Sequence, residues 1–221
     1  MAVIKAVIFD LDGVLISTDE LHYRAWKALA DRLGVPFDRA QNDRCRGISR
    51  MDSLEIVLER SPVKYTLREK EAFAAEKNEN YRSMLASLTE SDVPEGVLPT
   101  LALLKKRGYS LALASASKNA PLILERTGLG AYLDAVADGN CVTRSKPDPE
   151  VFLVAAEKLG IAPGECAAVD DALAGVEAAR AAGMLAVGYG DSAASGAGDI
   201  NLERFSQLAE VFTVPGEPVK A

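Results

Sequence analysis

The chain has 221 residues, of which 48% are hydrophobic and 26% charged, and its net charge is −7. This composition is typical of a globular protein with a full core, and the length leaves room for one inserted domain. The acidic balance excludes the basic face that a nucleic acid or an anionic membrane surface would need, so we expect neither partner.

The distribution of apolar residues and cysteines predicts a compartment and an oligomeric state. No segment approaches membrane-spanning length, and the N-terminus lacks a signal-peptide pattern. Three scattered cysteines without metal-ligand spacing, Cys45, Cys141 and Cys166, suggest reduced thiols. No extended apolar heptad pattern predicts a coiled coil. We therefore expect a cytoplasmic monomer.

The first predicted element is a short buried strand that ends in two carboxylates. The apolar run over residues 4–9 leads into Asp10, Asp12 and Gly13. Such a run is typical of a parallel strand, and open α/β sheets bind ligands at the carboxyl ends of their strands. Residues two apart point to the same side, so both acids can attract a hard cation such as Mg²⁺. Taken alone, they would equally suit a turn and a helix cap.

A block of helices follows this motif. Helical periodicity predicts amphipathic helices at residues 20–33, 49–60 and 66–88. We expect residues 16–91 to form a helical cap domain inserted after the first strand. Residues 1–15 and 92–221 would then form the α/β core domain.

Three further polar motifs accompany strand or helix signals in the second half of the chain. An apolar run at residues 111–114 ends at Ser115, whose hydroxyl can bond a phosphoryl oxygen. Lys146 precedes a proline and a predicted helix, where its cation would neutralise a transferring phosphoryl group. A third apolar run ends in Asp170 and Asp171, which can complete a metal site. The alternation of strands and helices predicts a Rossmann-like, doubly wound parallel sheet.

The order of these motifs is more specific than any one of them. A lone Lys before proline is usually solvated, and a lone Ser at a strand end usually closes a turn. The series Asp-x-Asp, Ser, Lys-Pro, Asp-Asp is similar to the four motifs of the haloacid dehalogenase-like superfamily. That resemblance implies that Asp10 is a nucleophile and Asp12 a general acid and base, with Ser115 and Lys146 on the phosphoryl group.

Almost the whole chain resembles the β-phosphoglucomutase family within that superfamily. The similarity is carried by residues 9–14, 22–29, 47–50, 77–81, 112–119 and 145–147, and only the segment after Asp191 is unconvincing. The resemblance implies interconversion of β-glucose 1-phosphate and glucose 6-phosphate through an aspartyl-phosphate and a bound β-glucose 1,6-bisphosphate. It implies Mg²⁺ held by the side chain of Asp10, the carbonyl of Asp12, and Asp170 with Asp171.

The resemblance also implies a set of residues that bind the phosphorylated sugar. They are His22, Arg46, Gly47, Arg50, Lys77, Ser115, Ala116, Ser117, Lys118 and Asn119. Arg50, with the last three, would hold the phosphate that is not being transferred. The chain departs from the family pattern in having Asp170 in place of Glu and Arg46 in place of Lys.

Three functions stay open from the sequence. A mutase is favoured by Arg50 and the loop at residues 117–119. A sugar-phosphate phosphatase would share every core motif and is the alternative. A sugar-phosphate binding protein without activity would be expected to lack Asp10 or Asp12, and both are present.

Overall fold

The computed structural model describes residues 3–45, 48–217 and 219, and the chain divides into two compact units. One unit combines residues 1–17 with 89–221, and the other is the insertion 18–88. The sequence places these boundaries at 15/16 and 91/92. That the units are a core domain and a cap domain stays a proposal. No helix formed by the described residues combines the length and apolarity needed to cross a membrane.

The first unit is built on one sheet of six parallel strands, as predicted. The strands occur in the order β3-β2-β1-β4-β5-β6, which is the order of a doubly wound sheet. Their bounds are β1 (Ala6–Phe9), β2 (Ser110–Ala114), β3 (Ala135–Ala137), β4 (Cys166–Asp170), β5 (Leu185–Tyr189) and β6 (Ile200–Leu202). The central strand β1 is entirely buried because helices cover both faces.

The register of the central strands brings three of the predicted motifs to one edge. Phe9 in β1 pairs with Leu113 in β2 and with Val169 in β4. The chain therefore leaves all three strands at the same level, and the N–H of Asp10 donates to the carbonyl of Val169 at 2.9 Å. This edge is where a doubly wound sheet binds its ligands.

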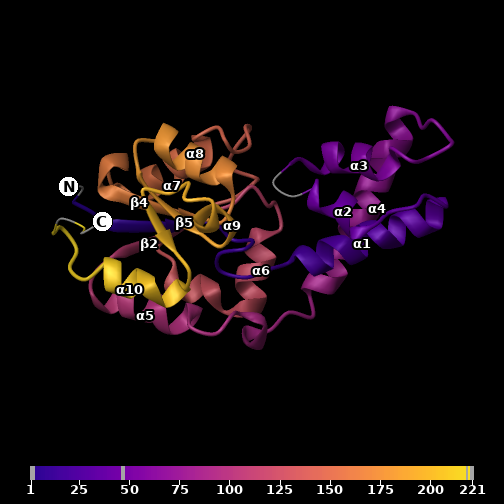
Figure 1. Cartoon of the computed structure of the whole chain (residues 1–221). Helices are drawn as coiled ribbons and strands as arrows, with labels where there is room; N and C mark the ends of the chain where they lie inside the picture. The colour runs from indigo at the N-terminus through magenta and orange to yellow at the C-terminus, as the bar shows by residue number, and fades with distance from the viewer. Residues whose placement is uncertain (1–2, 46–47, 218, 220–221) are drawn as a thin grey trace. The chain divides into compact units, whose positions relative to one another are not determined.

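Helices lie on both sides of the sheet. Figure 1 shows α7 (Glu150–Leu159) and α8 (Leu173–Ala181) on one side, and α5 (Val97–Lys106) and α10 (Leu208–Val211) on the other. The first side buries alternate strand residues such as Ala6 and Ile8 against Phe152. The remaining elements are η1 (Glu90–Asp92), α6 (Ala120–Thr127), η2 (Leu129–Tyr132), η3 (Pro163–Glu165), α9 (Asp191–Ala194) and η4 (Phe205–Gln207).

Aromatic residues from the end of the chain pack on the second side. The ring of Phe205 lies 5.8 Å from that of Phe9, and the ring of Phe212 lies 5.8 Å from that of Tyr109. The guanidinium of Arg107 donates to the carbonyl of Phe212 at 2.9 Å. The C-terminal segment is therefore part of the folded core.

The second unit consists of helices around a small core of its own. Its elements are α1 (Asp19–Leu33), α2 (Arg39–Asp43), α3 (Arg50–Leu58) and α4 (Leu67–Leu85). Trp26 and Leu29 on α1 pack with Leu54 and Val57 on α3. A capping box between Thr66 and Glu69 begins α4. The three predicted helices are confirmed, whereas the short α2 carries no periodic signal in the sequence.

The buried ring of Phe152 supplies a test of the sheet packing. Phe152 is fully buried, whereas its neighbour Leu153 is 39% exposed. We expect Phe152→Ala to lower the free energy of unfolding by about 3–5 kcal/mol, because it removes apolar burial and leaves a cavity. Urea unfolding measures the loss. The matched control, Leu153→Ala, should lower it by less than about 1 kcal/mol, and equal losses would contradict this packing.

Candidate active site

The amine of Lys146 joins the ends of three strands. Its Nζ donates to Asp10 Oδ1 at 2.5 Å, to Asp170 Oδ2 at 2.8 Å and to the carbonyl of Ala114 at 3.1 Å. These acceptors come from the ends of β1, β4 and β2. The side chains of Lys146, Asp10 and Asp170 are only 11%, 14% and 2% exposed. The structure thus brings three of the predicted motifs to one buried cluster of charges.

Burial and mutual attraction act in opposite directions within this cluster. Burial raises the pKa of Asp10 to about 8; the charge of Lys146 lowers it, while Asp170 and Asp12 add to the rise. Burial alone would lower the pKa of Lys146, but the two carboxylates outweigh it and raise that pKa above its ordinary value. Further positive charge beside Asp10 would favour its ionised form.

Asp170 has both carboxylate oxygens occupied. Oδ2 accepts from Lys146, and Oδ1 accepts from the N–H of Ala172 at 3.0 Å. The carboxylate also fills the space next to Gly175, where an added Cβ would lie 1.8 Å from Asp170 Cγ. Two hydrogen bonds and the close packing of Gly175 therefore hold the side chain toward Lys146.

Asp171 faces the loop that follows β1. Gly13 in that loop has a φ of +84°, and a Cβ built on it would lie 2.1 Å from Asp171 Oδ2. Only glycine provides both this backbone conformation and this space. The N–H of Gly13 donates to the carbonyl of Ile16 at 2.8 Å, which closes the turn around the half-buried Asp12. The carboxylate of Asp171 therefore lies against the loop that carries Asp10 and Asp12.

The donor chemistry of this edge fits Mg²⁺. Every predicted ligand is an oxygen: the carboxylates of Asp10, Asp170 and Asp171, and the main-chain carbonyl of Asp12. Among the residues that the structure describes, no group of three or more His, Cys, Asp or Glu side chains is arranged so that it could hold a metal ion by itself. Mg²⁺ does not require one, because it is usually bound through one or two carboxylates and keeps several waters.

A loop after β2 contributes main-chain and hydroxyl groups to the same edge. Ser115 is buried, and its N–H donates to the carbonyl of Ala137 at 3.0 Å. Its hydroxyl accepts from the N–H of Ser117 at 3.1 Å, and the hydroxyl of Ser117 accepts from the N–H of Asn119 at 3.3 Å. This series holds the exposed Ala116 and Lys118 on a fixed turn ahead of α6.

The helical unit holds a second buried cation. Lys77 on α4 is 2% exposed, its Nζ lies 2.8 Å from His22 Nδ1, and it stands 4.6 Å from the ring centres of both Trp26 and Tyr81. The hydroxyls of Tyr81 and Thr18 lie 2.8 Å apart. His22 and Lys77 belong to the predicted substrate-binding residues, whereas Tyr81 does not. Its spacing of four residues from Lys77 on one helix would have suggested the contact.

The electrostatics of this cluster keep the histidine neutral. Burial lowers the pKa of His22 to about 3, with additional lowering from the charges of Lys77 and Arg50. A neutral imidazole beside a charged amine must accept at Nδ1, which leaves the proton on Nε2.

The structure describes only some of the other predicted residues of the helical unit. Arg50 is half-buried in the first turn of α3, after the N-cap Ser49. No ion pair of Arg50 is found within the described part of the chain. Arg46 and Gly47 lie outside the described residues.

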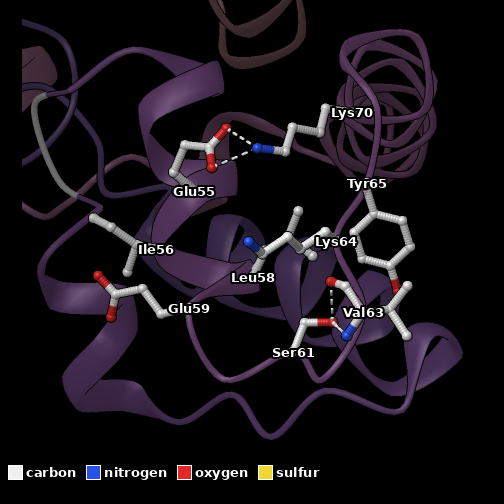
Figure 2. Close-up of a pocket in the computed structure, with 9 residues that line it drawn as sticks. All are labelled: Glu55, Ile56, Leu58, Glu59, Ser61, Val63, Lys64, Tyr65 and Lys70. Carbon is white, nitrogen blue, oxygen red and sulfur yellow. Dashed lines mark hydrogen bonds and ion pairs between the residues drawn. The ribbon is translucent and has the colours of Figure 1, made fainter.

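A cavity in the same unit does not involve the predicted site. It has a volume of about 500 Å³ (Figure 2). Lys70 on its wall donates to both carboxylate oxygens of Glu55 at 2.7 Å, so this cation is already paired. None of the predicted catalytic or substrate-binding residues lines it.

Comparisons with known proteins agree with this geometry. Residues 4–183 match the family of haloacid dehalogenase-like hydrolases. The β-phosphoglucomutase of Bacillus subtilis is 42% identical over 206 residues, which cover 92% of this chain and 91% of that protein. A phosphorylated carbohydrates phosphatase of Thermotoga maritima is 32% identical over 182 residues, which cover 81% of this chain and 82% of that one.

A solved structure is similar over the same extent. The crystal structure of a β-phosphoglucomutase from Clostridium difficile superposes with a TM-score of 0.84 and is 37% identical in sequence. The match covers 93% of each chain.

The buried histidine predicts a dependence of stability on pH. His22 is the only histidine of the chain. Below its ordinary pKa of 6.5 the unfolded chain takes up a proton that the folded protein accepts only near pH 3. Stability should therefore fall as the pH drops through this window, by at most about 1.4 kcal/mol per pH unit from this group.

Replacement of the histidine isolates its contribution. His22→Gln keeps an acceptor for Lys77 but does not titrate, so its free energy of unfolding should fall less steeply between pH 6.5 and pH 4.5 than that of the wild type. Urea unfolding across this range measures both slopes. Equal slopes would contradict the lowered pKa, because they would show that His22 takes up its proton over the same pH range in the folded and unfolded protein.

Proposed function

Because the chain belongs to the haloacid dehalogenase-like hydrolases and resembles β-phosphoglucomutases over almost its whole length, we propose that it is a phosphohexomutase. It interconverts β-D-glucose 1-phosphate and D-glucose 6-phosphate. The observation that carries the chemistry is the buried bond between Lys146 and Asp10 at the carboxyl end of the central strand. This bond supports the proposal because a carboxylate that could act as the nucleophile lies beside a fixed cation.

Asp10 is the proposed nucleophile. One of its carboxylate oxygens attacks the phosphorus of the bound sugar phosphate, and the bond between phosphorus and the sugar oxygen breaks. The product is an aspartyl-phosphate, which divides a difficult transfer into two easier steps. Lys146 lies within 2.5 Å of Asp10 Oδ1, so its charge is already in place where negative charge develops on the phosphoryl oxygens.

Asp12 is the proposed general acid and base. It gives a proton to the sugar oxygen that leaves in the first step. In the second step it takes the proton of the accepting sugar hydroxyl, whose oxygen attacks the phosphoryl group on Asp10. Such proton transfer contributes on the order of 10²–10⁴ in rate.

The two steps join into a mutase cycle. The 6-hydroxyl of β-glucose 1-phosphate accepts the phosphoryl group from Asp10, which gives β-glucose 1,6-bisphosphate. After the bisphosphate turns around, its 1-phosphoryl group passes to Asp10 and glucose 6-phosphate is released. The bisphosphate is thus both intermediate and activator.

Magnesium completes the proposed site. We propose that Asp10, the carbonyl of Asp12, and Asp171 hold Mg²⁺, which supplies further positive charge to the phosphoryl oxygens when bound. Asp170, also predicted as a ligand, accepts from Lys146 and from the N–H of Ala172, so we propose it as the partner of the lysine. Ser115 has its hydroxyl at the same edge and can donate to one of these oxygens while it accepts from Ser117.

Further residues are proposed to bind the rest of the substrate. In the first unit, the turn of Ser117, Lys118 and Asn119 offers hydroxyl, ammonium and amide groups to a second phosphate. In the helical unit, His22, Arg50 and Lys77 are proposed contacts of the sugar phosphate. The proposed substrate is small and soluble, and we keep the expectation of a cytoplasmic monomer.

A phosphatase is the second candidate. The relative from Thermotoga maritima is a phosphorylated carbohydrates phosphatase. In a phosphatase, water takes the phosphoryl group from Asp10 in place of a sugar hydroxyl. The β-phosphoglucomutases of Bacillus subtilis and Clostridium difficile have greater identity and coverage, which favours the mutase.

The products of one incubation distinguish these two candidates. Purified protein is given Mg²⁺, β-glucose 1-phosphate and a trace of glucose 1,6-bisphosphate. We expect glucose 6-phosphate to accumulate with little inorganic phosphate, because the phosphoryl group returns to a sugar. A coupled dehydrogenase assay and a phosphate assay measure both products. Release of one phosphate per sugar consumed would make the protein a phosphatase.

Removal of the nucleophile tests the covalent step. Asp10→Asn keeps the size of the side chain but is a poor nucleophile, so turnover should fall by at least roughly 10³-fold. Steady-state assays measure the loss, and mass spectrometry should no longer find a phosphorylated protein. The exposed acid Asp31, changed to Asn, is the control and should retain full turnover. Undiminished activity of Asp10→Asn would contradict the assignment.

A further inference from the structure

We propose that Ser192 is a positioning residue that holds the acid pair Asp170–Asp171 in the geometry required for magnesium and for Lys146. The proposal rests on the proposed magnesium-dependent phosphoryl transfer. Ser192 lies in α9, beyond residue 183, where the match to the family ends.

Ser192 binds both main-chain carbonyls of the acid pair. Its N–H donates to the carbonyl of Asp171 at 2.8 Å, and its hydroxyl donates to the carbonyl of Asp170 at 2.7 Å. The same hydroxyl accepts from the N–H of Tyr189 at 3.0 Å, and it lies 3.1 Å from the carbonyl of Tyr189, a longer contact than its bond to Asp170. Ser192 is 2% exposed, so water cannot readily replace these bonds. One residue thus fixes the two consecutive peptide groups that carry the acids.

The two side chains on this fixed backbone have different tasks. Asp170 points to Lys146 and accepts from it at 2.8 Å. Asp171 lies against Gly13, next to the loop of Asp10 and Asp12. A shift of the backbone would therefore displace the partner of the catalytic lysine and a proposed magnesium ligand together.

The geometry also separates the tasks of the two acids. Asp170 has one oxygen on Lys146 and the other on the N–H of Ala172, so it is placed as an anchor for the lysine. Asp171 has its carboxylate against Gly13, in the loop of Asp10 and Asp12, so it is the acid of the pair that we propose as a magnesium ligand.

The residue that caps the C-terminus of α9, Ser195, provides the matched control. Ser195 has a hydroxyl that donates to the carbonyl of Ser192 at 2.8 Å. It is a serine in the same segment with one hydrogen bond, but it does not bond to Asp170 or Asp171. Ser195→Ala therefore removes a comparable bond and leaves the support of the acid pair in place.

Magnesium binding by the protein without sugar phosphate tests the role of Ser192. Isothermal titration calorimetry with MgCl₂ should show about 10-fold weaker binding for Ser192→Ala than for the wild type, because groups that orient metal ligands have effects of this order. In steady-state assays kcat should fall, and the Mg²⁺ concentration for half-maximal rate should rise about 10-fold, with KM for the sugar phosphate little changed. Ser195→Ala should bind Mg²⁺ within about twofold of the wild type.

Unchanged Mg²⁺ affinity would overturn the proposal. If Ser192→Ala lowers the melting temperature but binds Mg²⁺ as tightly as the wild type, Ser192 supports only the fold and the proposal is overturned. Should Ser192→Ala not fold, Ser192→Cys fills the same place with a weaker donor and should also bind Mg²⁺ less tightly. Unchanged affinity of that variant would overturn the proposal as well.

This test is independent of the sugar chemistry. Calorimetry uses only the protein and MgCl₂, so release of inorganic phosphate in the product assay would change the proposed function and leave the role of Ser192 intact. Conversely, a wild type with mutase activity and a Ser192→Ala variant with normal Mg²⁺ affinity would remove only this inference.

Discussion

The paired burial of Lys146 with Asp10 and Asp170 is the interaction on which the site depends. A buried charge is tolerated only when opposite charges and hydrogen bonds surround it. Here the ammonium has two carboxylates and one carbonyl within 3.1 Å. These three acceptors come from three neighbouring strands, so the sheet register fixes the place of the lysine. The same charges that hold the strand ends together are those that a phosphoryl group would meet.

The residues at this edge of the sheet could be predicted from the sequence because each follows a recognisable apolar run, and the topology of parallel strands brings them together. Apolar runs that end in Asp10, Ser115 and Asp170 can be recognised residue by residue, and parallel strands must bring their carboxyl ends to one side. The helices of the inserted unit were predicted for a similar reason. Their apolar periodicity and the capping box at Thr66 are local signals.

Other parts could not be predicted because they depend on partners distant in the sequence. The strands β3 and β6 have three residues each, too few for a recognisable period. Tyr81 bonds to Thr18, 63 residues earlier. Ser192 has an ordinary loop sequence around it, and its bonds to Asp170 and Asp171 exist only after β4 and β5 are adjacent. Contacts of this kind form only when distant segments pack together, so a local sequence pattern does not reveal them.

The order of synthesis affects how such a sheet can form. β1 leaves the ribosome first, but its partners are β2 and β4, where Ala6 pairs with Ser110 and with Cys166. The helical unit of residues 18–88 is made in between and has a hydrophobic core of its own, so it can fold before the partners of β1 have been made. During that interval a fully apolar strand is unpaired and open to aggregation. The proposed nucleophile, Asp10, thus directly follows the strand that waits longest for its partners in the chain.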